Sequence, residues 1–400
     1  MNSWEDAVTF LADCEYIGKD TKKTKRARFN EADLAALIAG RTAPLRIIGG
    51  GTRDVGAPVK GEVLSLRGLS GIVDYEPGAM TLVVKAGTSL AEVDAALAQE
   101  GQRLAFEPAD WRALLGTTGE PTVGGMVAAN VSGPRRVAVG ACRDFLLGLR
   151  FVDGRGRVLK NGGRVMKNVT GYDLVKLMAG SWGSLGAMTE ASFKVLAKPA
   201  AEVTLVKSGL SAQDGVHALT QALGTPYDVS GAAWVGVGRQ GEARVRLEGL
   251  PGSVAYRREA LLNVLGAGWD AVSAEPSAAL WREVRDVTPF VGRAGTVWRV
   301  SVKPTDGPRL LEALGAEEAL LDWGGGLVWL LMPEGQDGGE AAVRAALRPL
   351  GGHATLMRGA AELRSRIAVF QPEAPAVATL AAAIRREFDP NSIFNAGIMG

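Results

Sequence analysis

The sequence predicts an α+β protein in which a glycine-rich, strand-rich domain precedes a second α+β domain. Glycine accounts for 53 of the 400 residues, well above its usual share of about 7%, and in the first half many glycines separate short apolar runs. After Pro199 the pattern changes, because six of the nine tryptophans lie between residues 201 and 370. A chain of 400 residues is long enough for about two or three domains.

The first half follows this prediction in order. Residues 1–30 are a polar segment that ends in a basic run. Asn30 is a suitable N-cap for a helix that ends at Gly40. A second helix is expected after Ser89, which forms a capping box with Glu92. The apolar runs predict strands at 45–48, 63–66, 72–75, 81–86 and 187–196, a strand pair at 149–160 and a helix at 172–179.

The second half predicts helices that cover an antiparallel sheet. A last helix begins near Pro375, with Val377, Leu380, Ile384 and Phe388 on its apolar face. The predicted strands lie at about 202–207, 231–237, 243–248, 296–302 and 327–332, and the helices at about 211–223, 254–265, 277–285 and 338–349.

Composition excludes several classes of protein. The net charge of +2 gives no basic surface for nucleic acid. Two cysteines and two histidines cannot form a disulfide framework, a thiolate zinc cluster or a histidine-rich metal site, so no metal is predicted. The chain contains no apolar run of 18 residues and no secretory signal. We therefore expect a cytoplasmic protein that reaches the inner membrane only through partner subunits.

Three glycine-rich loops suggest a ligand held largely by main chain. In RIIGGGTRD (46–54), three glycines and Thr52 follow a strand, so consecutive N–H groups can converge on an anion; an ordinary tight turn remains the alternative. The second loop lies at 117–136 and the third at 171–195. Together they fit an extended ligand such as a dinucleotide.

The order of these segments resembles the FAD-binding domain of the vanillyl-alcohol oxidase / p-cresol methylhydroxylase superfamily. Within it, GPRR (133–136), GACRDFLLG (140–148) and KLMAGSWGSLG (176–186) resemble the FAD-binding E subunit of bacterial glycolate oxidase. The similarity continues at VWRVSVKPTD (297–306), DWGGGLVWL (322–330), GGHATLMRG (351–359) and the tail FDPNSIFNAGIMG (388–400).

This resemblance implies a domain plan and a cofactor. An N-terminal extension (1–30) precedes a two-subdomain PCMH-type FAD-binding domain (31–200), an α+β substrate or cap domain (201–370), and a helix and tail (371–400) that return to the flavin. The implied FAD-binding residues are Ile48, Gly49, Gly50, Gly51, Thr52, Gly119, Thr122, Val123, Gly124, Gly125, Asn130, Met188 and Asn395. In the tail, Ala396 and Ile398 stand where the family has Pro and Arg.

We expect the FAD to be bound non-covalently. Covalent attachment in this superfamily uses a His, Cys or Tyr near the flavin, and neither the GGGT loop nor residues 117–134 offer one. Cys142 is the nearest candidate, and the resemblance implies that it packs in the core. Because Gly50 is assigned to the pyrophosphate, Gly50→Val is expected to lose FAD while the fold survives.

Catalytic residues are not identified by the sequence. Oxidation of a 2-hydroxy acid needs a base for the hydroxyl proton and a cation for the carboxylate. His353 is the candidate base, and Arg299 and Arg358 rank first among the candidate cations, ahead of Arg239, Arg282, Arg285 and Arg293. Two distant histidines cannot supply the histidine-rich constellation of the superfamily's catalytic relatives.

The predicted function is an FAD-binding redox subunit of a glycolate oxidase complex that passes electrons to partner subunits. The implied partners are a sister FAD subunit, which would bind the small 2-hydroxy acid, and an iron–sulfur subunit, because this chain lacks a cysteine cluster of its own. Part of the Trp-rich domain is expected at the interface. The alternatives are an autonomous 2-hydroxy-acid dehydrogenase and a non-catalytic scaffold subunit.

Overall fold

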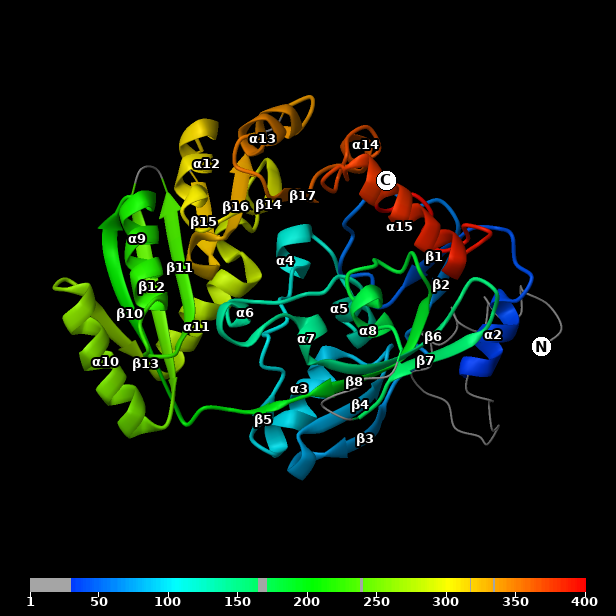
Figure 1. Cartoon of the computed structure of the whole chain (residues 1–400), viewed down its shortest axis with the longest axis horizontal. Coiled ribbons are helices and arrows are strands. Elements are labelled where there is room, and N and C mark those ends of the chain that lie inside the picture. Colours follow the sequence, from blue (N-terminus) through cyan, green and yellow to red (C-terminus); the bar gives the residue numbers. More distant parts are fainter. Residues whose placement is uncertain (1–29, 165–170, 238–239, 317, 334) are drawn as a thin grey trace.

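Two sheets dominate the computed structural model, which describes residues 30–164, 171–237, 240–316, 318–333 and 335–400. Figure 1 shows the sheets in separate halves of the molecule, with short helices between them. The five-stranded sheet has the order β3 (Ile72–Glu76), β4 (Thr81–Lys85), β8 (Ala187–Lys194), β6 (Leu146–Val152), β7 (Val158–Gly162). The eight-stranded sheet has the order β13 (Asp270–Ser273), β10 (Ala201–Leu210), β12 (Gln240–Gly249), β11 (Val229–Val237), β15 (Glu318–Asp322), β16 (Leu327–Met332), β14 (Thr296–Ser301), β17 (His353–Arg358).

Every neighbouring pair in these two sheets is antiparallel, which confirms the predicted α+β class. Two small pairs complete the strands: β1 (Leu45–Ile48) lies parallel to β2 (Glu62–Ser65), and β5 (Gln102–Arg103) is antiparallel to β9 (Leu196–Ala197).

The helices begin largely where capping residues predict. Asn30 caps α2 through the amides of Ala32 and Asp33, and Ser89 accepts from the Glu92 amide at the start of α3. The helices of the first half are α2 (Glu31–Ile38), α3 (Leu90–Gln99), α4 (Arg112–Leu115), α5 (Val123–Ala128), α6 (Arg136–Val139), α7 (Cys142–Phe145) and α8 (Leu174–Met178). Those that follow are α9 (Ala212–Leu223), α10 (Pro251–Leu265), α11 (Ala274–Asp286), α12 (Asp306–Leu314), α13 (Glu340–Leu347), α14 (Ala361–Arg364) and α15 (Pro375–Phe388).

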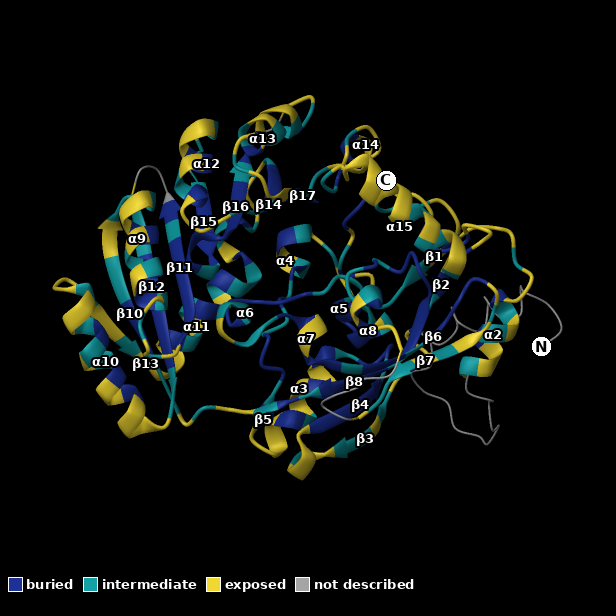
Figure 2. Ribbon diagram, viewed as in Figure 1, coloured by how far each residue is buried: buried dark blue, intermediate teal, exposed yellow. Residues whose placement is uncertain are grey.

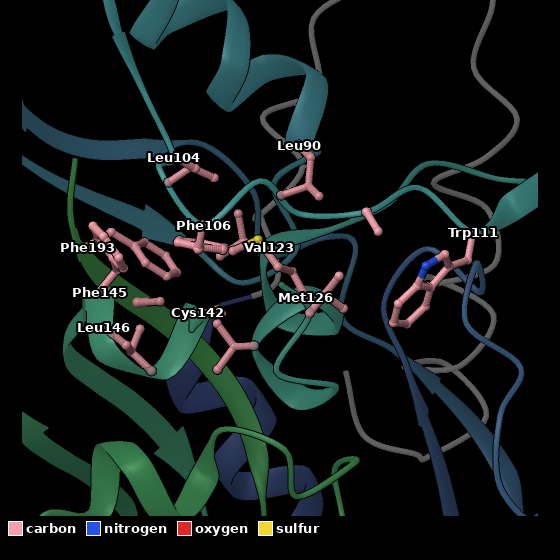
Figure 3. Close-up of a cluster of buried hydrophobic side chains, with 14 of the residues drawn as sticks. Leu90, Leu104, Phe106, Trp111, Val123, Met126, Cys142, Phe145, Leu146 and Phe193 are labelled. Atoms are coloured by element: carbon pink, nitrogen blue, oxygen red, sulfur yellow. The ribbon is translucent and has the colours of Figure 1, made fainter. Parts of the chain in front are cut away.

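One hydrophobic cluster crosses the boundary between the two halves. It joins Phe106 and Phe193 of the first half to Leu320 and Trp329 on one face of the eight-stranded sheet. The ring of Trp111 meets that of Trp329 edge-on, with centroids 5.9 Å apart. Figure 2 shows this buried layer, and Figure 3 shows its first-half part. A second cluster lies under α9, α10, α12 and α13 on the other face of the sheet.

A network of buried charges also joins the halves. Arg246 on β12 donates to both carboxylate oxygens of Glu107, at 3.0 and 2.9 Å, and Arg135 pairs with Glu248 at 2.6 Å and also with Glu107. Burial alone would raise the pKa of Glu107, but Arg246 and Arg135 outweigh it and hold that pKa below its ordinary value.

Two expectations need correction. Only the C-terminal part of the predicted apolar face of α15 is covered, because Val377 is 52% and Leu380 62% exposed, while the Phe388 ring lies 6.0 Å from that of Phe151. The tryptophans expected at an interface are mostly core residues, since Trp234, Trp281, Trp298 and Trp329 are at most 3% exposed.

Candidate functional site

The glycine loop leaves a row of donors without partners. The amides of residues 49–53 follow β1 directly, and none of them donates to an acceptor among the described residues. Gly51 has a φ of 69°, a left-handed conformation that glycine adopts at little cost. Unpaired N–H groups in a loop of this kind suit an anion such as a phosphate.

The second loop packs against the first through backbone. A Cβ on Gly49 would lie 2.2 Å from Thr122 Oγ1, and one on Gly50 would lie 1.6 Å from the Glu120 carbonyl oxygen. Gly119 in turn approaches the Gly50 carbonyl, at 2.3 Å from a built Cβ. Gly50 therefore has to be glycine because of its protein neighbour, and the left-handed residue of the loop is Gly51.

The third loop and the C-terminal tail close the site from the other side. Asn395 uses its side-chain amide on protein: Oδ1 accepts from the Ile47 amide at 2.8 Å, and Nδ2 donates to the Trp182 carbonyl at 2.8 Å. The tail also bonds to β1 through main chain, because the Leu45 amide donates to Ile393 O at 2.6 Å. Asn395 thus fixes the loops instead of offering a free polar group.

These loops surround a cavity of about 990 Å³, a figure that includes its opening to solvent. Of the residues assigned to FAD, the cavity is lined by Ile48, Gly49, Gly50, Gly51, Thr52, Thr122, Gly124, Gly125, Met188 and Asn395. Gly119, Val123 and Asn130 do not line it. Val123 is fully buried, and Asn130 Oδ1 accepts from the Arg143 amide at 3.0 Å.

Arg53 is a cavity residue that the sequence did not single out. Its Nη2 donates to the Ala109 carbonyl at 3.3 Å, but its Nε and Nη1 are buried without a hydrogen-bond partner among the described residues. Nη1 lies 3.5 Å from a Cβ built on Gly125. Burial lowers the pKa of Arg53 to about 10, although Asp110 opposes the shift. A buried cation with unpaired donors beside five free amides fits an anionic ligand.

The candidate catalytic residues have different fates. Arg358 donates to four backbone carbonyls, of Leu114, Phe290, Arg293 and Gly295, so it is a structural residue and no candidate for substrate binding. Arg282, Arg285 and Arg293 each form an ion pair with a carboxylate. Arg299 and His353 share one face of the eight-stranded sheet, and Arg239 lies outside the described residues.

Cys142 is fully buried in the first-half core, among Met126, Phe145 and their neighbours (Figure 3). Burial raises the pKa of its thiol, which keeps it protonated and unreactive at neutral pH.

Comparison with known proteins agrees with this geometry. A family model described as an FAD binding domain matches residues 30–162, which carry the glycine loop and the second loop. A solved structure of alkyldihydroxyacetonephosphate synthase superposes with a TM-score of 0.66 at 16% identity, covering 91% of this chain and 73% of that chain. The fold is therefore that of a PCMH-type FAD-binding protein.

The whole length of the chain has a nearer relative. It is 36% identical over 358 residues to the glycolate oxidase subunit GlcE of Escherichia coli, covering 89% of this chain and 92% of that protein. The chain belongs to the GlcE family. Over 146 residues it is also 31% identical to the glycolate oxidase subunit GlcD of Bacillus subtilis, covering 36% of this chain and 30% of that protein.

Among the described residues, no helix is both long and apolar enough to cross a membrane.

Proposed function

We propose that this chain is the FAD-binding redox subunit of a glycolate oxidase complex, which accepts electrons from 2-hydroxy-acid oxidation and passes them to partner subunits. The observation that carries the proposal is the row of free amides at 49–53, together with the unpaired Arg53 guanidinium, at one wall of a cavity of about 990 Å³. Five N–H donors and a cation would match the two negative charges of a dinucleotide diphosphate.

Each part of the site has a separate task. The amides of residues 49–53 and Arg53 would hold the diphosphate, and Gly124 and Gly125 leave room for a flat or extended group at the start of α5. The tail, fixed by Asn395, closes the cavity on the side of Trp182 and limits the access of water. Bound FAD supplies a centre that can take up two electrons and release them singly.

The proposed partners are a sister flavoprotein of the GlcD type and an iron–sulfur subunit. The sequence contains two cysteines, Cys14 and Cys142, which are too few to hold an iron–sulfur cluster. Electrons therefore have to leave the flavin through another chain. The names of the relatives, which are numbered subunits of one oxidase, support such an assembly. The complex would lie in the cytoplasm and meet the inner membrane through its partners.

The test compares the purified chain with the co-expressed complex. We expect about one FAD per chain, all of it released by acid precipitation, and glycolate-dependent dye reduction by the complex only. Colour that stays with the acid pellet would show a covalent link. A colourless chain would favour a scaffold subunit. Dye reduction by the isolated chain as fast as by the complex would favour an autonomous dehydrogenase.

A further inference from the structure

Two arginines converge on one indole ring where the second domain meets the first. Arg299 lies on β14 opposite Trp329 on β16, on the sheet face that packs against the first half. Arg136 begins α6, a short helix that contacts β11 of the same sheet (Figure 1). The Arg136 guanidinium lies 4.4 Å and that of Arg299 5.3 Å from the ring centre of Trp323.

The Trp323 ring is held in place from both domains. Its Nε1 donates to the Gly133 carbonyl at 3.1 Å, and its own amide donates to Asp322 Oδ1 at 2.7 Å. Gly133 belongs to the loop at 117–136, whose Thr122, Gly124 and Gly125 line the cofactor cavity. The arginine pair is thus connected by a few residues of chain to the proposed FAD site.

Neither guanidinium has an anionic partner. Within the described part of the chain, no carboxylate comes within 4.0 Å of Arg136 or Arg299, and neither side chain donates a hydrogen bond to protein. Other buried arginines are paired: Arg246 with Glu107 and Arg364 with Asp54. The nearest acidic group in electrostatic terms is Asp322, whose burial raises its pKa to about 7, so it supplies only part of a negative charge.

Such a pair is unfavourable without a ligand. Burial lowers the pKa of Arg299 to about 10, and the neighbouring charge of Arg136 lowers it further in the same direction. Stacking on tryptophan recovers about 0.5–2 kcal/mol per cation but leaves the N–H donors unsatisfied. A bound anion would satisfy the donors and remove the repulsion between the two charges.

His353 adds a group of a different kind. It lies at the exposed start of β17, paired across the sheet with Ser301, two residues beyond Arg299 on β14. Burial and then the charges of Arg299 and Arg136 lower its pKa, so its imidazole is neutral at neutral pH and can accept a hydrogen bond.

We propose that Arg136, Arg299 and Trp323, with His353 at the edge, form a binding site for the carboxylate of a small 2-hydroxy or 2-oxo acid at the junction of the two domains. The planar guanidinium groups provide paired donors for a carboxylate, and the imidazole faces the hydroxyl or keto oxygen beside it. The choice of a 2-hydroxy or 2-oxo acid rests on the proposed function, whereas the anion site rests on the arginine pair alone.

Calorimetric titration of the full FAD-containing chain with sodium glycolate tests this site. We expect binding of glycolate and glyoxylate but none of glycolamide, which lacks the carboxylate charge. Arg299→Gln and Arg136→Gln should each weaken glycolate binding by about tenfold or more, because each removes a hydrogen bond to a charged group. Arg309→Gln is the matched control: Arg309 is 68% exposed on α12, across the sheet, and should bind glycolate like the unchanged chain.

Unchanged affinity in both variants would overturn the site. Chloride or sulfate that binds as tightly as glycolate would also overturn it, as an adventitious ion only. If Arg299→Gln fails to fold, the half-buried Arg136 on α6 carries the test through Arg136→Gln. The FAD content of the same samples separates this inference from the proposed function, because a chain that holds FAD but no glycolate refutes the carboxylate site and leaves the redox role intact.

Discussion

Arg53 is a residue whose role is invisible in the sequence, where it is one of 45 Lys and Arg side chains. Only the folded chain places its guanidinium under the glycine loop, with Nε and Nη1 unpaired. A desolvated cation of this kind is costly unless a ligand compensates. The residue is therefore expected to contribute more to cofactor affinity than to the stability of the chain without FAD.

Arg53→Met should raise the dissociation constants of FAD and of ADP by about ten- to a hundredfold, since a hydrogen bond to a charged group contributes about 1.5–3 kcal/mol. Riboflavin, which has no phosphate, should bind as before. Fluorescence titration measures all three. Arg46→Met is the control, because Arg46 lines the same cavity but is half exposed and pairs with Asp54 at 3.5 Å. An unchanged ADP affinity would refute the assignment to the diphosphate.

Gly50 calls for a different expectation from the one that the sequence alone suggested. Gly50→Ala should lower the melting temperature as well as the FAD content, because its Cβ would have to displace the Glu120 carbonyl, 1.6 Å away. Gly51→Ala is the comparison. Its Cβ meets nothing within 4 Å, so its cost is confined to about 1 kcal/mol for the left-handed backbone. Thermal unfolding that ranks Gly51→Ala below Gly50→Ala would contradict the packing of the two loops.

At the scale of elements, local signals predicted most of the chain. The strand at 45–48 coincides with β1, and Asn30 and Ser89 cap their helices as expected. The sequence missed β13, β15, β17 and α12, of which the three strands are no longer than six residues. Short strands gain their definition from neighbours in the sheet, and those neighbours are distant in sequence.

The tail is an element whose position depends on one side chain. Asn395→Ala removes hydrogen bonds to Ile47 and Trp182, on the β1 side and the third-loop side of the cavity. We expect a loss of about 1–3 kcal/mol in unfolding free energy and a parallel loss of FAD affinity. Denaturant titration with and without FAD measures both. Asn391→Ala should change neither, because exposed Asn391 donates only to the Arg41 carbonyl; equal effects of the two variants would refute the role of Asn395.

At the scale of the whole molecule, the charge network between the domains fixes their arrangement. Arg246 and Glu107 are 139 positions apart, so no local pattern could pair them. The same holds for Arg299 and Arg136, which come together only when the eight-stranded sheet packs on the first half. The glycine loops, by contrast, were predictable because each carries its signal within a few residues.

Arg246→Met should destabilise the chain by about 3–5 kcal/mol, because Glu107 would remain buried and partly unpaired. Arg246→Met combined with Glu107→Gln should recover part of this loss. Because the folded-state pKa of Glu107 and of Glu248 lies below the ordinary value, their contribution is complete above about pH 4.3 and declines as the pH falls below it. Denaturant titrations from pH 3 to 7 should show a weaker acid dependence in the double variant. An acid dependence equal to that of the unchanged chain would refute the role of the network.

The place of Ile398 in the cavity wall, beside residues of the glycine loop, has a consequence for biosynthesis. The ribosome makes the phosphate-binding loop early, but the wall opposite it belongs to a segment made nearly 350 residues later. A nascent chain can therefore fold much of its first sheet without being able to retain the flavin. Cofactor loading becomes a late event that follows synthesis of the second domain, and chains interrupted before the tail should emerge colourless.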